Sequence, residues 1–339
     1  MGGTALQSQT GKPADRILKE ELPELHNLVN SRLIGSNYTI LNSYTGKPSQ
    51  GDLDVLIVYD KNINQLIKSL FPELTHIVNN GDVSSFLIPF NNKSIQIDFI
   101  VTGNQEAFTT RYNYLGRGDF GNILGRITSF YGLKFTMNGL YYILRKQDVF
   151  GKSGYYTIDH QVCREIKVAT SFNEVSTILE LPPVPETFDS LEECSNWIKD
   201  NLNLYCGNCF NSTEYNHADR VRIDKRNAYV HMDGEIISSF ELNFKRNQVY
   251  SNILKTFPNF NTIISNYRKQ IIKEEKDNKD FKERIDGKYL KELTNYQGKD
   301  ICDFIKSFLS NTNKETIVKL PIETVQSQLK DFYEVYRIR

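Results

Sequence analysis

Three aspartates stand in or beside apolar segments, where a carboxylate is costly to bury. Asp52 and Asp54 flank Leu53 at the start of the run "DLDVLIV", and Asp98 interrupts the run "SIQIDFIV". A buried carboxylate needs a partner that neutralises it. Successive side chains of a β-strand point to opposite faces, so Asp52 and Asp54 share one face while Leu53 points to the other. The same alternation separates Asp98 from its apolar neighbours.

Pairing these two strands would bring all three carboxylates to one place. Three adjacent carboxylates repel one another, and two Mg²⁺ ions roughly 3.5–4 Å apart would relieve that repulsion. Mg²⁺ favours a few carboxylates together with phosphate oxygens and water, and Mn²⁺ substitutes for it at such oxygen ligands. We therefore expect Asp52, Asp54 and Asp98 to be catalytic metal ligands in phosphoryl transfer. The alternative treats them as a turn residue, a solvent-facing residue and an unrelated edge residue.

The loop that leads into the first strand suits phosphate binding. Residues 42–51, "NSYTGKPSQG", include the small residues Ser43 and Gly51 and offer accessible backbone N–H groups to an anion. Lys47 is either a phosphate contact or an exposed loop residue. The segment is not a P-loop, because Leu41 stands where that motif needs its first glycine.

A second segment, "GDFGNILGRITSFYG" at residues 118–132, is a Gly-rich entry into a helix. We expect Asp119 to occupy the N-cap position and Gly132 to end the helix. Gly118, Asn122 and Arg126 are further residues of this segment whose types and spacing we single out. In the alternative, Asp119 is only a cap, and Asn122 and Arg126 are exposed helix positions.

Together, the two segments resemble the nucleotidyltransferase superfamily, and most of all the polymerase beta-like, family X DNA polymerases. In that family a Gly-Ser pair precedes a Gly-Asp-x-Asp strand, and a third Asp lies on a neighbouring strand. Ser43, Gly51 and the three aspartates match these places. The resemblance implies that the aspartates bind two Mg²⁺ ions and that Asp98 helps to activate a primer 3′-hydroxyl. Asn42 departs from the pattern, since the family has glycine there.

The second segment is similar to the helix that closes over the nucleotide in the same family. The resemblance implies that Asp119 packs near the base, Asn122 near the base or sugar, and Arg126 near the minor groove of the nascent pair. Gly118 matches the glycine before the aspartate. The match covers roughly residues 30–180. The family's N-terminal helical domains, with their lyase chemistry and their grip on gapped DNA, have no counterpart before residue 30.

Hydrophobic periodicity predicts an α+β fold. We expect residues 1–12 to be a flexible tail and residues 13–105 to form a nucleotidyltransferase-type palm, a mixed β-sheet with helices. A small α/β nucleotide-binding subdomain over 106–185 and a mainly helical accessory domain of unknown role over 186–339 follow. Within these domains we expect a helix over 14–33 interrupted near Pro23, a helix over 62–71, a strand over 153–159, capping boxes at Ser171 and Ser190, and a last helix over 323–337.

Composition and charge bound the class of protein. The 339 residues hold no apolar run of the roughly 20 residues that a membrane span needs and no secretory signal, so we expect a cytoplasmic protein without membrane contact. Basic and acidic residues balance at 41 each, yet residues 241–339 hold 19 Lys and Arg against 14 Asp and Glu. This basic excess permits contact with a phosphate backbone.

The five cysteines of a chain without a secretory signal are expected to be reduced thiols. Cys206 and Cys209 form a single C-x-x-C pair. A zinc site needs about two more ligands, and the nearest candidates, Cys194 and His217, match no standard spacing. Metal binding at this pair and two inert thiols in a turn therefore both stay open.

These observations favour an Mg²⁺-dependent enzyme that transfers a nucleoside monophosphate from a nucleoside triphosphate to a nucleic-acid 3′-hydroxyl and releases pyrophosphate. The resemblance implies a polymerase beta-like DNA polymerase of DNA repair, with DNA as the partner. One alternative is a nucleotidyltransferase with another acceptor, such as a tRNA or RNA 3′ end, a protein hydroxyl or a small molecule. Another is a binding or assembly protein on a transferase fold that has lost its activity.

Overall fold

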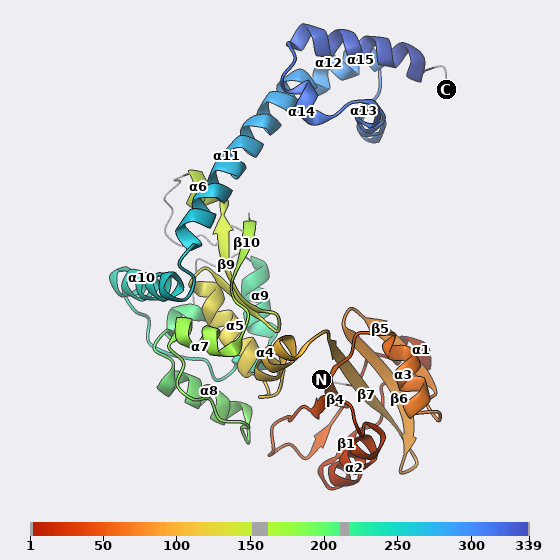
Figure 1. Cartoon of the computed structure of the whole chain (residues 1–339), viewed down its shortest axis with the longest axis vertical. Helices are drawn as coiled ribbons and strands as arrows, with labels where there is room; N and C mark the ends of the chain where they lie inside the picture. Colours follow the sequence, from red (N-terminus) through yellow and green to blue (C-terminus); the bar gives the residue numbers. More distant parts are fainter. Residues whose placement is uncertain (1–2, 151–161, 211–216, 338–339) are drawn as a thin grey trace. The chain divides into compact units, whose positions relative to one another are not determined.

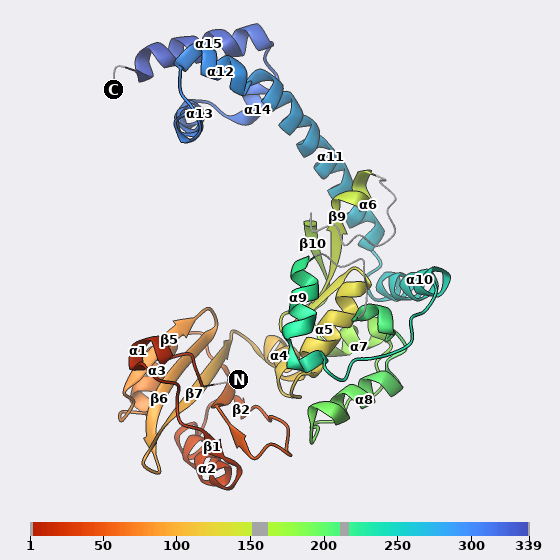
Figure 2. The same ribbon diagram turned by 180° about the vertical axis from the view of Figure 1, so that it is seen from behind.

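The structure is a computed structural model that describes residues 3–150, 162–210 and 217–337. Within these residues it combines helices with three β-sheets, which confirms the mixed α+β class (Figures 1 and 2). The elements of the first part are α1 (Gln7–Thr10), β1 (Ile17–Leu18), η1 (Lys19–Glu21), α2 (Leu22–Arg32), β2 (Tyr38–Ile40), β3 (Ser49–Gln50), β4 (Asp52–Val58), α3 (Ile63–Leu70), β5 (His76–Asn80), β6 (Val83–Phe90), β7 (Lys93–Thr102) and α4 (Gln105–Leu115).

The later elements are α5 (Phe120–Phe130), β8 (Leu133–Thr136), β9 (Gly139–Arg145), α6 (Lys146–Phe150), β10 (Val162–Ala169), α7 (Phe172–Leu179), α8 (Leu191–Asn201), η2 (Gly207–Cys209), α9 (His217–Lys225), η3 (Asn227–Tyr229), α10 (Ser239–Thr256), α11 (Phe260–Arg284), α12 (Gly287–Thr294), α13 (Lys299–Asn311), α14 (Lys314–Ile317) and α15 (Ile322–Tyr336). The strand expected at 153–159 lies outside the described residues.

The largest sheet has the strand order β2-β4-β7-β6-β5, in which only β4 and β7 run parallel. One face packs against α2 and α3 through a core that includes Leu53 and Val55 of β4 and Ile97 and Phe99 of β7. These are the alternating apolar positions that the sequence predicts to be buried. Because they point into the core, the residues between them, the aspartates among them, point to the other face. Helix α4 covers part of that second face.

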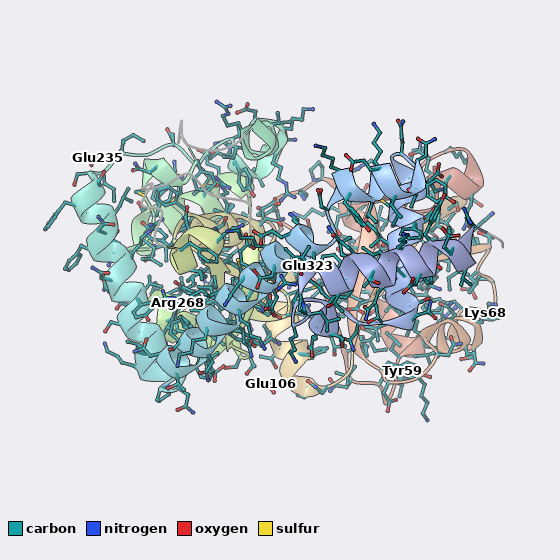
Figure 3. All side chains as sticks on the ribbon, turned by 90° about the horizontal axis from the view of Figure 1, so that it is seen from above. Tyr59, Lys68, Glu106, Glu235, Arg268 and Glu323 are labelled. Atoms are coloured by element: carbon teal, nitrogen blue, oxygen red, sulfur yellow. The ribbon has the colours of Figure 1, made fainter. Side chains whose placement is uncertain are left out.

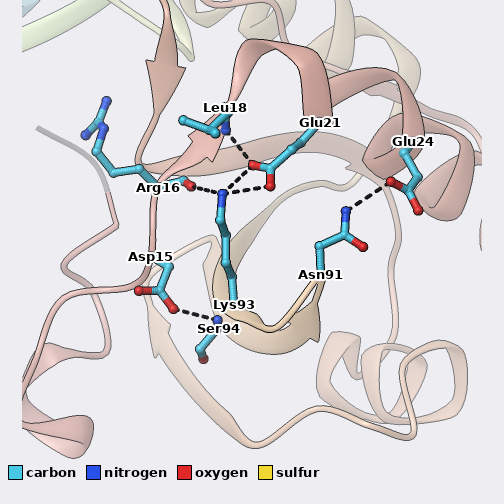
Figure 4. A network of polar contacts seen from close by, with 8 residues as sticks. All are labelled: Asp15, Arg16, Leu18, Glu21, Glu24, Asn91, Lys93 and Ser94. Carbon is cyan, nitrogen blue, oxygen red and sulfur yellow. Dashed lines mark hydrogen bonds and ion pairs between the residues drawn. The ribbon is translucent and has the colours of Figure 1, made fainter.

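Polar contacts tie the chain before α2 to the end of the β6–β7 hairpin (Figure 4). The two turn residues of the hairpin, Asn91 and Asn92, have φ of 47° and 60°, the left-handed region that asparagine tolerates. Lys93 Nζ donates to Glu21 at 2.7 Å, and the Asp15 carboxylate accepts from a backbone N–H of β7 at 2.7 Å. The segment that leads back to the N-terminus is thereby fixed beside the sheet.

The N-terminal segment differs in two respects from its expected structure. The predicted helix over 14–33 begins only at Leu22, with Pro23 in its first turn, where a missing backbone N–H costs nothing. Residues 3–12, within the segment that we expect to be a flexible tail, contact the sheet in the structure, and Leu6 is only 2% exposed. The backbone N–H groups of Gly3 and Ala5 donate to side chains of the sheet, which adds to the apolar burial of Leu6 in ordering the segment.

Contacts divide the described chain into two units. Unit 1 comprises Met1–Arg145 and Ser153–Asn261, and unit 2 comprises Lys146–Lys152 and Thr262–Arg339. This division differs from the predicted boundaries at 106 and 186. The chain beyond residue 186 stays in unit 1 as far as Asn261, because α10 packs on α7. The buried Asn252 of α10 donates to the backbone carbonyl of Ile178 at 3.2 Å and to Glu180 at 2.9 Å.

In unit 1, a second sheet of order β10-β9-β8 packs with α5 and α7. The capping box at Ser171 is confirmed, since its side chain accepts from the Glu174 N–H and Glu174 returns the bond. At Ser190 only half of the predicted box forms, because the Glu193 carboxylate accepts from another backbone N–H. Helix α5 ends at Phe130, two residues before the left-handed Gly132 that was predicted to stop it.

Unit 2 is helical in its described residues. Its core includes Phe304, Phe308 and Leu329, and α15 confirms the predicted last helix to within one residue at each end. Figure 3 shows the exposed side chains along α11 and α15, where Arg268 and Glu323 mark the two helices. Among the described residues, no helix combines the length and the apolar character that crossing a membrane requires.

Candidate active site

The pairing of β4 with β7 brings the three aspartates together, as the sequence predicts. In the parallel register Asp54 lies opposite Asp98, and Asp52 lies opposite Gln96. All four side chains stand on the face opposite the apolar core. Ser85 of β6 lies on the other side of Asp98 in the same sheet. The site therefore sits on three adjacent strands whose register is fixed by the burial of their apolar positions.

Burial and mutual repulsion make two of these carboxyls weaker acids. Burial, followed by the charges of Asp52 and Asp98, raises the pKa of Asp54 from 3.8 to about 7. Burial also raises the pKa of Asp98 to about 6, although hydrogen bonds from Ser85 and Gln96 oppose the rise. Such a cluster gains from a proton or a cation that reduces its negative charge.

Protein donors engage two of the three carboxylates. The backbone N–H of Gly3 donates to Asp52 Oδ2 at 2.9 Å. The buried Gln96 donates through Nε2 to Asp98 Oδ1 at 2.8 Å, and its Oε1 accepts from the Ala5 N–H at 3.2 Å. Nothing in the sequence pattern pointed to Gly3 or Ala5, because their approach depends on a contact between distant parts of the chain.

The aspartates have the oxygen ligands that Mg²⁺ prefers, but in this structure their side chains do not converge on one coordination site. Across residues 3–150, 162–210 and 217–337, no group of three or more His, Cys, Asp or Glu side chains converges closely enough to hold a metal ion. Asp52 is held by Gly3 and Asp98 by Gln96 instead. The residue types therefore fit the metal, and the bond from Gly3 competes with it for one of the two Asp52 carboxylate oxygens.

This competition predicts that loosening Gly3 strengthens metal binding. Gly3 has φ of 82°, and a Cβ there would lie 2.3 Å from the carbonyl oxygen of Gly51. We expect Gly3→Ala to displace the segment and tighten Mn²⁺ binding about 3- to 10-fold, since one hydrogen bond to a charged group no longer has to be broken. Titration of free Mn²⁺ by electron paramagnetic resonance measures this affinity.

Gly11→Ala is the matched control, because Gly11 also has a positive φ, 75°, but open space around its Cβ position. It should leave Mn²⁺ affinity unchanged. Equal Mn²⁺ affinities for Gly3→Ala and the parent chain would show that the segment does not compete with the metal.

The second predicted segment is joined to the first through Tyr44. The Tyr44 hydroxyl donates to Asp119 Oδ2 at 3.1 Å and accepts from the Asp119 N–H at 2.9 Å. Gly118 has φ of 59°, and a Cβ there would lie 2.5 Å from the Tyr44 ring. Asp119 does occupy the N-cap position of α5, but its side chain bonds to Tyr44 instead of capping the helix. The sequence pattern did not predict that Tyr44 would bond to Asp119, because the two residues are 75 positions apart.

A pocket of about 870 Å³ in unit 1 gathers several of the predicted nucleotide-binding residues. Lys47, Asp119 and Asn122 line it, as do two cations that the sequence analysis missed, Lys225 and Arg226. Its volume lies within the range of small-molecule sites, roughly 300–1,000 Å³. Asn122 Nδ2 donates to Asp119 Oδ1 at 3.3 Å, so the two side chains face the pocket as a pair.

Other predicted residues lie elsewhere. Ser43 lines a second pocket of about 480 Å³ that shares Tyr44 and Lys47 with the first. Gly51 is buried beneath Gly3. Arg126 is buried rather than exposed, and its Nε donates to the carbonyl of Cys209 at 3.1 Å. The three aspartates line neither of these two pockets.

The C-x-x-C pair has no further ligand among the described side chains. Cys206 Sγ and Cys209 Sγ lie 3.7 Å apart. Cys194 interacts with Tyr44 and Asp119 instead. The side chain of His217 lies outside the described residues.

Comparison of the chain with protein-family models and with curated protein sequences found no match to either. The resemblance to nucleotidyltransferases therefore rests on the motif residues of segments 42–54 and 118–126 and on Asp98.

Proposed function

We propose that the chain is an Mg²⁺-dependent nucleotidyltransferase that adds a nucleoside monophosphate to a nucleic-acid 3′-hydroxyl, by resemblance a DNA end, and releases pyrophosphate. The observation that carries this proposal is the placement of Asp54 directly opposite Asp98 on neighbouring parallel strands, with Asp52 on the same face. A nucleotidyltransferase-type palm is the finer fold that we propose for this mixed sheet.

The three aspartates are the proposed metal ligands. When bound, Mg²⁺ supplies charge neutralisation for the triphosphate and for the pyrophosphate that leaves. Asp98 is the proposed proton acceptor for the attacking hydroxyl. A carboxyl whose pKa is raised to about 6 holds a proton more readily than an ordinary aspartate does. Gln96 and Ser85 orient this carboxylate, which keeps one geometry for the proton transfer.

The larger pocket is the proposed nucleotide site. Lys47, Lys225 and Arg226 bring three positive charges to its walls, which suits a triphosphate.

We expect Arg226→Gln to raise the Kd for a nucleoside triphosphate about 5- to 30-fold, because a charge-assisted hydrogen bond is worth roughly 1–2 kcal/mol. Titration of a fluorescent nucleotide in the presence of Mg²⁺ measures it. Lys134→Gln, an exposed change on β8, is the control that should leave Kd unchanged; equal Kd values for both variants would remove Arg226 from the site.

Unit 2 offers a basic hollow for the phosphate backbone of the acceptor. A pocket of about 810 Å³ is lined by four lysines, Lys146, Lys276, Lys279 and Lys282, and by one glutamate that pairs with Lys146. Lysines on a helix contact phosphates without regard to base sequence. This surface supports a nucleic-acid acceptor over a small molecule.

One experiment tests the proposal. The full chain is incubated with Mg²⁺ and labelled nucleotides, together with gapped DNA, single-stranded DNA, RNA or no acceptor. Extension of a DNA primer is the expected result. Labelled RNA, or label transferred to the protein itself, would move the activity to another acceptor. No product with any acceptor, together with nucleotide binding that ignores Mg²⁺, would contradict the proposal and favour a binding protein.

A further inference from the structure

Two cysteine sulfurs lie close together in a buried turn that the proposed transfer reaction does not use. Cys206 precedes η2 and Cys209 ends it, and their Sγ atoms lie 3.7 Å apart. Cys209 is 0% exposed and Cys206 is 4% exposed. A disulfide bond is roughly 2.0 Å long, so each sulfur is the nearest candidate partner of the other for such a bond.

The backbone around this turn holds the pair in place. The N–H of Gly207 donates to the carbonyl of Glu235 at 2.7 Å, and a Cβ at Gly207 would lie 2.1 Å from the carbonyl oxygen of Gly234. The backbone at Gly207 and the backbone of residues 234–235 are thus in direct contact, which only a glycine at position 207 permits. This contact fixes the backbone between the two cysteines.

The surroundings distinguish the two thiols. The Tyr131 hydroxyl lies 3.7 Å from Cys206 Sγ and is anchored by donating to the Leu204 carbonyl at 2.7 Å. A hydrogen bond from Cys209, aided by Tyr131 and by the charge of Lys245, lowers the pKa of Cys206 to about 7. Burial raises the pKa of Cys209. A thiolate is the nucleophile in sulfur chemistry, so Cys206 is the thiol that reacts first.

We propose that Cys206 and Cys209 form a reversible dithiol–disulfide site that a peroxide oxidises. The Cys206 thiolate attacks one peroxide oxygen; an S–O bond forms, the O–O bond breaks, and, for hydrogen peroxide, a water leaves after taking up a proton. Cys206 is then a sulfenic acid. The Cys209 sulfur attacks it, the S–S bond forms, the S–O bond breaks and a second water leaves. Two thiols lose two electrons and the peroxide gains them, and an external thiol reverses the oxidation.

A peroxide is favoured over a bulky disulfide because of access. Only 4% of Cys206 is exposed, which admits a molecule of nearly the size of water more readily than a peptide disulfide. Two of the other three thiols, Cys194 and Cys302, differ from this pair. Burial raises the pKa of Cys194 to about 12, and Cys302 is exposed in unit 2. Neither has a second sulfur within hydrogen-bonding distance among the described residues.

The test uses the full reduced chain and needs no transfer activity. It is exposed to hydrogen peroxide, quenched with an alkylating reagent, digested and measured by mass spectrometry. We expect a peptide containing Cys206 and Cys209 to lose two hydrogens and to escape alkylation, and a reducing dithiol to restore alkylation. Oxidised glutathione should act more slowly. Cys194→Ser is the matched control, a buried cysteine outside the pair, and it should form the same link.

Two variants assign the roles. Cys209→Ser should stop at the sulfenic acid of Cys206, which dimedone traps, whereas Cys206→Ser should yield neither the link nor a trapped Cys209. Full alkylation of both cysteines under conditions that oxidise Cys302 would overturn the proposal. So would zinc in metal analysis of the purified chain that protects both thiols, or a faster reaction with oxidised glutathione than with peroxide.

Discussion

The Asp98→Asn variant is expected to lose nucleotide transfer by about 10²–10⁴-fold, the usual contribution of a positioned general base. Asparagine has the size of aspartate, and its amide oxygen still accepts from Gln96, which now donates to Asp98 at 2.8 Å. The fold and the pocket that carries Asn122 should therefore persist. The expected signature is a fall in the single-turnover rate with little change in the nucleotide Kd.

Asp60→Asn is the control for this experiment, because Asp60 is exposed beyond the other end of β4. It should transfer nucleotides at the parent rate. Parent-like turnover of Asp98→Asn would remove Asp98 from the chemistry, whereas a loss of thermal stability as large as the loss of activity would indicate a structural role instead.

The metal-free chain is expected to lose stability as the pH rises from about 4 to about 7. Asp54 has a folded pKa of about 7, above its ordinary 3.8, so the folded chain holds this proton more tightly than the unfolded chain does. This contribution to stability is complete at a pH below the pKa that Asp54 has in the unfolded chain. It is lost as the pH rises through the pKa that Asp54 has in the folded chain. Asp98, with a folded pKa of about 6, acts in the same direction.

Asp54→Asn should remove most of this dependence. At pH 8 without metal, we expect the variant to be more stable than the parent by roughly 2–4 kcal/mol, because a tenfold change in proton affinity corresponds to about 1.4 kcal/mol. At pH 5 the difference should shrink, since Asp54 is then protonated. Urea unfolding with a chelator present, repeated across this pH range, measures the free energy of unfolding.

The same unfolding measurements with Mg²⁺ present complete the test of Asp54. Mg²⁺ should stabilise the parent chain at pH 8 and have much less effect on Asp54→Asn, because the neutral side chain no longer contributes charge to the site. Identical pH profiles for parent and variant would mean that Asp54 is well solvated in solution. A Mg²⁺ effect of equal size in both would place the ion elsewhere.

The elements that carry the candidate site could be predicted because they follow from local patterns. Alternation along β4 and β7 determines that Leu53 and Phe99 enter the core and that Asp54 and Asp98 leave it. An aspartate in an apolar strand needs a partner, which predicts that the two strands are neighbours. The capping box at Ser171 and the end of α5 before Gly132 are likewise local, since each satisfies backbone groups within a few residues.

Some predictions that differed from the structure are local, such as the start of α2 at Leu22, but those at the candidate site concern contacts between distant segments. The sequence by itself determined which residues line the face of the sheet that carries the aspartates. Only the tertiary structure decided that Gly3 lies on Asp52, that Tyr44 bonds to Asp119, and that Arg126 turns toward the carbonyl of Cys209. Such contacts depend on the complementary shape and hydrogen bonding of surfaces far apart in the chain, which no short-range periodicity records.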